Sequence, residues 1–103
     1  MPNAWKRHEL AIAKRLGGKR AGPTGRTGPD VLHPHLGIEC KERHTLPKWL
    51  INAMAQCVGA SATWQLPVVI LHQLGQRHDD DLVVMRLADW EQWYGETHIE
   101  REN

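Results

Sequence analysis

Three charged residues between positions 30 and 41 have the types and spacing needed to bind a metal ion and activate water. Asp30 precedes Glu39 by nine residues, and Lys41 follows Glu39 by two. Side chains alternate along an extended strand, so Glu39 and Lys41 would share one face while Ile38 and Cys40 point to the other. An acid and a base on one strand face, beside a further carboxylate, could position a water molecule for hydrolysis.

Glu9 adds a third carboxylate to this set. It lies on the same helical stripe as Trp5 and Ile12, where a charge costs free energy unless it is paired or binds a cation. An alternative is that Glu9 sits at the edge of the stripe and reaches water. If Glu9, Asp30 and Glu39 converge, their mutual repulsion is relieved by a cation that prefers oxygen ligands, Mg²⁺ or Mn²⁺. Such an ion would activate water for attack on a phosphate ester, with Lys41 orienting or deprotonating that water.

The charge of the chain is unevenly distributed along the sequence. The net charge is only +1, yet residues 1–48 carry ten Lys or Arg against four Asp or Glu, and residues 49–103 carry three against eight. A basic first half suits an anionic partner such as nucleic acid, although two oppositely charged solvated faces would give the same count.

A loop rich in Gly, Thr and Pro runs from residue 19 to residue 29, and its basic side chains suit contact with backbone phosphates. The alternative is an ordinary solvated loop, and the nucleotide-binding pattern GxxxxGK[ST] is absent. The predicted DNA-binding residues are Lys19, Arg20, Arg26, Arg43 and Lys48.

Length and composition predict one domain over residues 1–103. The 103 residues include 41% apolar and 24% charged residues, the usual proportions of a globular domain. We expect no membrane segment, because no apolar run approaches 18 residues, and no signal peptide at the N-terminus. Two cysteines make no disulfide framework, which favours a reducing, cytoplasmic setting, including that of a host cell if the chain is phage-encoded.

The pattern of apolar residues and turn signals predicts an α/β fold with one mixed central sheet flanked by helices. A first helix should end near Leu16 at Gly17–Gly18, a second should be capped by Thr45 with Pro47 in its first turn, and a short third should end at Gly95 before a frayed polar tail over residues 95–103. The predicted strands are 30–33, 36–43, 67–71 and 81–86, with room for one more near 19–22.

The remaining aromatic and sulfur-containing residues have simpler interpretations. Trp5 and Trp49 are predicted core residues, and Trp90, Trp93 and Tyr94 are expected in the core or at a dimer contact. Cys40 and Cys57 are predicted to be inert buried thiols, and they have no zinc-type spacing with the histidines.

Pro29-Asp30 followed by Glu39-Cys40-Lys41 resembles the motif of the PD-(D/E)xK nuclease superfamily. The order and short length are most similar to archaeal-type Holliday junction resolvases, and the resemblance covers about residues 5–94. It implies a restriction-endonuclease-like core, Mg²⁺ at Glu9, Asp30 and Glu39, and catalysis assisted by Lys41. It also implies a metal contact from the main-chain carbonyl of Cys40 and a supporting role for Gln56.

The resemblance implies a Mg²⁺-dependent endonuclease that resolves four-way DNA junctions in recombination and repair, acting as a homodimer. The first strand of that fold is barely visible here, and the same core serves nucleases with other substrates. Two alternatives therefore stay open: an endonuclease for duplex, flap or single-stranded DNA, and a non-catalytic DNA-binding protein with the same fold.

Overall fold

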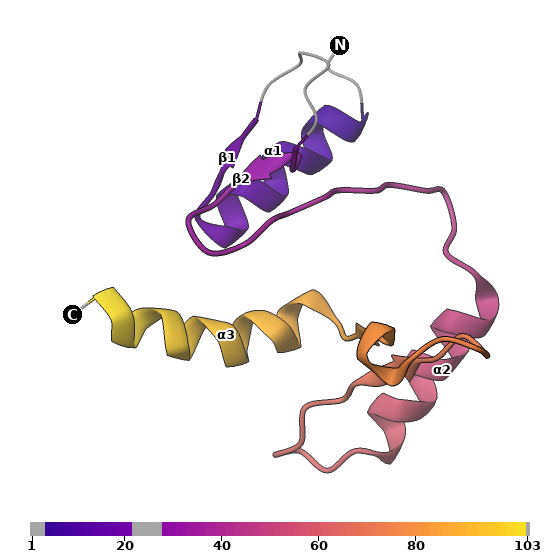
Figure 1. Cartoon of the computed structure of the whole chain (residues 1–103). Coiled ribbons are helices and arrows are strands. Elements are labelled where there is room, and N and C mark those ends of the chain that lie inside the picture. Colours follow the sequence, from indigo (N-terminus) through magenta and orange to yellow (C-terminus); the bar gives the residue numbers. More distant parts are fainter. Residues whose placement is uncertain (1–3, 22–27, 103) are drawn as a thin grey trace. The chain divides into compact units, whose positions relative to one another are not determined.

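The chain is a small mixed α/β protein with two compact units. The structure, a computed structural model, describes the backbone of residues 4–21 and 28–102 and the side chains of residues 6–21 and 28–94. The first unit is Met1–His44 and the second is Thr45–Asn103 (Figure 1). Each unit holds at least one helix and one antiparallel pair of strands, so the predicted α/β class is confirmed at this level.

The first unit packs helix α1 (Ala4–Leu16) against a hairpin of β1 (Lys19–Arg20) and β2 (Val31–Leu32). The strands are antiparallel, with Arg20 opposite Val31, and the hairpin lies along the helix in Figure 1. Among the described side chains, the apolar core here consists of Val31 on β2 (0% exposed) and Ala13 on α1 (4% exposed). The short strand predicted near 19–22 is therefore present.

Helix α1 ends where the sequence predicts, and the two glycines have different tasks. Gly17 has φ +75°, the left-handed conformation that glycine adopts most readily. The Gly18 N–H then donates to the Ala13 carbonyl at 2.7 Å, which closes the helix end. A Cβ atom on Gly18 would lie 2.6 Å from the Leu32 carbonyl oxygen, so Gly18 allows β2 to approach closely.

The segment after β2 corrects the prediction of a strand over residues 36–43. Val31 and Ile38 form an isolated antiparallel bridge. The Ile38 carbonyl accepts the N–H groups of Asp30 (2.7 Å) and Val31 (3.2 Å). Residues 39–43 then continue without strand pairing. The Ile38 carbonyl accepts both the Asp30 and the Val31 N–H groups, and backbone pairing with β2 stops there.

The second unit contains helix α2 (Lys48–Ala60), an antiparallel hairpin of β3 (Val69–Leu71) and β4 (Leu82–Val84), and helix α3 (Leu87–Glu102). A short 3₁₀ helix, η1 (His78–Asp80), lies in the connection between the two strands (Figure 1). Helix α2 contacts β3, and the Cys57 thiol on α2 donates to the Val68 carbonyl at 3.3 Å. Both cysteines are free and partly buried.

Three predictions about this second unit are wrong in detail. Pro47, not Thr45, is the N-cap of α2, and no side chain caps the helix. Helix α3 continues through Gly95 to Glu102, since one helical glycine costs only about 1 kcal/mol. Trp49 is 60% exposed and does not belong to a core.

The strands form two separate two-stranded sheets, β1–β2 and β3–β4, in place of one predicted mixed sheet. Strands of two or three residues carry few pairing groups, and each pair here closes with its own sequence neighbour. Within the described residues, the helices are too short or too polar to cross a membrane.

We predict that Gly18→Ala lowers the free energy of unfolding by about 1–3 kcal/mol, because the new Cβ overlaps the β2 backbone. Gly37→Ala is the matched control, since a Cβ there meets nothing within 4 Å and the residue does not have positive φ. Urea unfolding followed by circular dichroism measures both. Equal stability of the two variants would contradict the close approach of β2 to Gly18.

Candidate functional site

Asp30 uses its main chain and its side chain to join three segments of the first unit. Its carbonyl accepts the Ala21 N–H at 3.0 Å, and its own N–H donates to Ile38 at 2.7 Å. Its Oδ2 accepts the Cys40 N–H at 2.7 Å. The Asp30 carboxylate is thereby fixed against the Glu39-Cys40-Lys41 segment, although that segment is not a strand.

Glu39 and Lys41 lie together on the exposed side of this segment. The Lys41 Nζ is 3.1 Å from the Glu39 Oε2, and the side chains are 67% and 56% exposed, respectively. An ion pair this open to water contributes at most about 1 kcal/mol. Both groups can therefore exchange this contact for another ligand with little loss of stability.

Glu9 has a different environment, because it is buried and has a strong partner. Glu9 is 9% exposed, and Arg20 Nε donates to the Glu9 Oε1 at 2.8 Å. The prediction that a carboxylate on this stripe needs a partner is satisfied by Arg20, one of the residues assigned to DNA. Removing one partner of a pair this buried costs about 3–5 kcal/mol. Glu9 and Arg20 therefore join α1 to β1 in this structure.

The Cys40 thiol lies within the electrostatic influence of all three predicted carboxylates. Burial raises the pKa of the thiol above its usual value, and the negative charges of Asp30, Glu9 and Glu39 raise it further, in that order. Cys40 is partly buried and not sealed in the core. Each of the three predicted acids therefore contributes to the electrostatic environment of Cys40.

The three carboxylates do not form a closed set of ligand atoms. Glu9 is held by Arg20, Asp30 by the Cys40 amide and Glu39 by Lys41. Mg²⁺ usually takes one or two protein carboxylates and completes its shell with water and phosphate oxygens. Asp30 and Glu39, which flank the main chain of Cys40, fit that requirement, whereas Glu9 would first have to leave Arg20.

The other predicted site residues are distributed over both units. Gln56 is exposed on α2 in the second unit, so its place beside the acids stays a prediction. Lys19 and Arg43 are exposed in the first unit, and Arg43 Nη1 donates to the Glu42 carbonyl at 2.8 Å. Arg20 is mostly buried against Glu9, and Arg26 lies outside the described residues.

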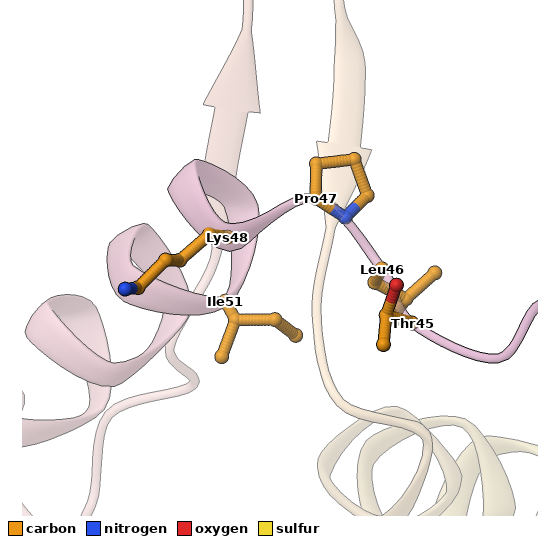
Figure 2. A pocket seen from close by; sticks show the side chains of 5 residues that line it. All are labelled: Thr45, Leu46, Pro47, Lys48 and Ile51. Atoms are coloured by element: carbon orange, nitrogen blue, oxygen red, sulfur yellow. The ribbon is translucent and has the colours of Figure 1, made fainter.

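Lys48, the last predicted DNA contact, is exposed at the start of α2 and lines a hollow of about 730 Å³. In Figure 2, the side chains of Lys48 and Ile51 extend from the first turn of α2, and Thr45 and Leu46 lie on the segment before the helix. Leu46 and Ile51 are about half exposed, at 54% and 49%. A hollow with this much apolar lining is a poor phosphate site, so a contact to DNA would come from the outward Lys48 amine alone.

Sequence analysis missed a second group of ligand-type side chains. His72, His78 and Asp81 have potential ligand atoms within 4.8 Å of one another, a criterion that Glu9, Asp30 and Glu39 do not meet. The available signal was a histidine at the end of one strand of a hairpin and an aspartate at the start of the other. The sequence predictions placed strands at 67–71 and 81–86 and gave no role to these three side chains.

Comparison with known proteins gives no family for this chain. No family model, no curated protein and no solved structure matches it.

We predict that Asp30→Asn lowers the pKa of the Cys40 thiol, because it removes the largest of the three charge effects and keeps an oxygen that can accept the Cys40 N–H. The pH dependence of alkylation by iodoacetamide, in a Cys57→Ser background, measures this pKa. The exposed neighbour Glu42 supplies the control, since Glu42→Gln should leave the pKa unchanged.

The same raised pKa has a consequence for stability. The folded state holds the thiol proton more tightly than the unfolded state, so the stabilisation is complete below the unfolded thiol pKa. It is lost as the pH rises from there through the raised folded pKa. An unchanged Cys40 pKa in Asp30→Asn would contradict the placement of the carboxylate beside the thiol.

Proposed function

We propose that this chain is a Mg²⁺-dependent DNA endonuclease of the PD-(D/E)xK class that acts on four-way junctions as a homodimer. The hydrogen bond from the Cys40 amide to Asp30 carries the proposal. It sets an otherwise distant carboxylate beside Glu39 and Lys41, which is the association that the motif resemblance requires. The restriction-endonuclease-like character of the core is part of this proposal.

The proposed roles follow from the environment of each side chain. Asp30 and Glu39, together with the main-chain carbonyl of Cys40, would hold Mg²⁺, which when bound lowers the pKa of water and offsets phosphate charge. Lys41 is exposed and paired only to an exposed acid. Its ammonium would hydrogen-bond the scissile phosphate or the attacking water while the water oxygen bonds phosphorus and the P–O ester bond breaks.

Glu9 and Gln56 have supporting places in the proposal. Glu9 adds negative charge near Cys40, and its direct contact with a cation would require Arg20 to turn away, where it could meet a phosphate. Gln56 would support the site from α2. Lys19, Arg26, Arg43 and Lys48 would hold phosphates along the DNA backbone, through charge and without sequence preference.

We predict that cleavage of DNA requires Mg²⁺ or Mn²⁺ and is lost in chelator. Asp30→Asn, Glu39→Gln and Lys41→Ala should each lower the cleavage rate by at least about 100-fold while DNA binding is largely kept, because each removes a group used in the reaction and the other basic residues supply most of the phosphate contacts. Single-turnover cleavage and filter binding measure the two effects. The neighbouring Glu42→Gln should cut normally.

Full activity in chelator would overturn the metal requirement, and normal cleavage by the Asp30 and Glu39 variants would place the site elsewhere. DNA binding without any cleavage by the unmodified chain would favour the non-catalytic alternative.

We predict further that the junction is cut in preference to matched duplex, flap and single-stranded substrates, and that light scattering gives a dimer mass. Two matched cuts across a nearly two-fold junction need two sites at a fixed separation, which a closed two-fold pair supplies. Trp93 is 60% exposed and offers an apolar contact on α3, next to a Trp90–Tyr94 ring stack at 4.6 Å. A monomer that cuts duplex DNA equally well would keep the nuclease proposal and overturn the junction assignment.

A further inference from the structure

The β3–β4 hairpin brings two imidazoles to one carboxylate. His72 Nδ1 lies 2.6 Å from Asp81 Oδ1, and His78 Nδ1 lies 3.0 Å from Asp81 Oδ2. Each carboxylate oxygen thus meets the nitrogen of a different ring. All three residues belong to the second unit, and the first-unit acids take no part in this group.

The register of the hairpin creates this arrangement. Leu71 pairs with Leu82 at the end of the ladder, so His72 and Asp81 are the next residues across from each other and their side chains share a face. The third residue comes from the turn. The 3₁₀ helix η1 starts at His78, and the Asp81 N–H donates to the His78 carbonyl at 3.0 Å. Residues three apart in a 3₁₀ turn lie above one another, which brings His78 to the same carboxylate.

The environment of the group combines a fixed acid with accessible bases. The Asp81 side chain is 12% exposed, whereas the side chains of His72 and His78 are 30% and 84% exposed. The two rings stack with centroids 4.3 Å apart and an interplanar angle of 29°. His72 also lines a hollow of about 570 Å³ with Trp49 and Gln73. An ion here would have protein ligands on one side and open space on another.

The ligand types and distances favour Zn²⁺ over Mg²⁺. Two imidazoles and a carboxylate suit Zn²⁺, whereas Mg²⁺ prefers oxygen ligands alone. A tetrahedral Zn²⁺ ion with bonds of about 2.0–2.1 Å keeps neighbouring ligand atoms about 3.3–3.4 Å apart. The two histidine–carboxylate distances of 2.6 and 3.0 Å are shorter by less than an ångström. Small side-chain rotations of the exposed rings would provide that room.

We propose that His72, His78 and Asp81 form a Zn²⁺ site that links the end of β3 to the start of β4 and to η1, and that leaves a fourth coordination position open. The site uses no residue of the proposed nuclease centre, so either proposal can fail without the other. Histidine–carboxylate hydrogen bonding alone would produce the same contacts in the metal-free protein, and the experiment distinguishes the two cases.

Isothermal titration calorimetry of the metal-free full chain with Zn²⁺ at neutral pH tests the site. Loss of an outer partner of a metal site already weakens affinity by about 10–100-fold, so His72→Ala, His78→Ala and Asp81→Asn should each weaken Zn²⁺ binding by at least about 10-fold. His44→Ala, an exposed histidine outside the group, should bind Zn²⁺ like the unmodified chain, and the Asp30→Asn, Glu39→Gln double variant reports whether the ion binds at the first-unit acids instead.

A second measurement protects the test from misfolding. Co²⁺ substituted for Zn²⁺ should show the intense visible absorption of tetrahedral coordination in the unmodified chain and lose it in His78→Ala. That side chain is 84% exposed, so its removal costs little packing beyond the stack with His72. No Zn²⁺ binding by the unmodified chain, or binding that survives all three substitutions, would overturn the proposal. Loss of binding in the Asp30, Glu39 control instead would assign the ion to the first unit.

Discussion

The first unit depends on the way Asp30 is held. Its amide, carbonyl and carboxylate bond to Ile38, Ala21 and Cys40, three points on two separate segments. No regular strand is needed after Ile38, because the Asp30 carboxylate accepts the Cys40 N–H that a neighbouring strand would otherwise bind. Three hydrogen bonds hold the residue, so its carboxylate keeps a fixed position. The proposed metal site therefore begins with a structural requirement of the hairpin.

The charges around Cys40 are balanced in three different ways. Glu9 is buried and neutralised by Arg20, Glu39 is exposed and loosely paired with Lys41, and Asp30 accepts an amide hydrogen. Removing Arg20 would leave a buried carboxylate uncompensated, whereas Lys41 can leave Glu39 with little loss, because water screens that pair. A cation that arrives with a phosphate would therefore bind Asp30 and Glu39 more easily than Glu9. The side-chain environments of the three acids account for this difference.

The two units separate two kinds of ligand chemistry. The first unit gathers carboxylates with a lysine, which suits hard ions and phosphate, and the second gathers His72, His78 and Asp81, which suits a borderline ion. Apolar surface is exposed in both units. Val31 and Ala13 are buried in the first unit, but Leu10 and Leu32 there are about half exposed, and Trp49, Ile70 and Leu82 of the second unit are about half exposed or more.

The sequence by itself determined what local chemistry dictates. Gly17 and Gly18 end α1 because one adopts positive φ and the other admits β2, and two apolar runs on either side of a polar segment placed the β3–β4 hairpin within a few residues. The association of Asp30 with the Glu39–Lys41 segment followed from motif spacing, since a carboxylate ahead of an acid–base pair is a pattern readable in order along the chain.

Tertiary structure alone decided which partners those residues have. Spacing could not reveal that Arg20 would turn inward to Glu9, because that pair joins residues eleven apart through helix packing. Nor could it reveal that His72 meets Asp81, because their contact depends on the register of β3 and β4, which a shift of one residue would reverse. Local rules fix where elements begin and end, and pairing across elements is fixed by packing and register, which no short stretch of sequence contains.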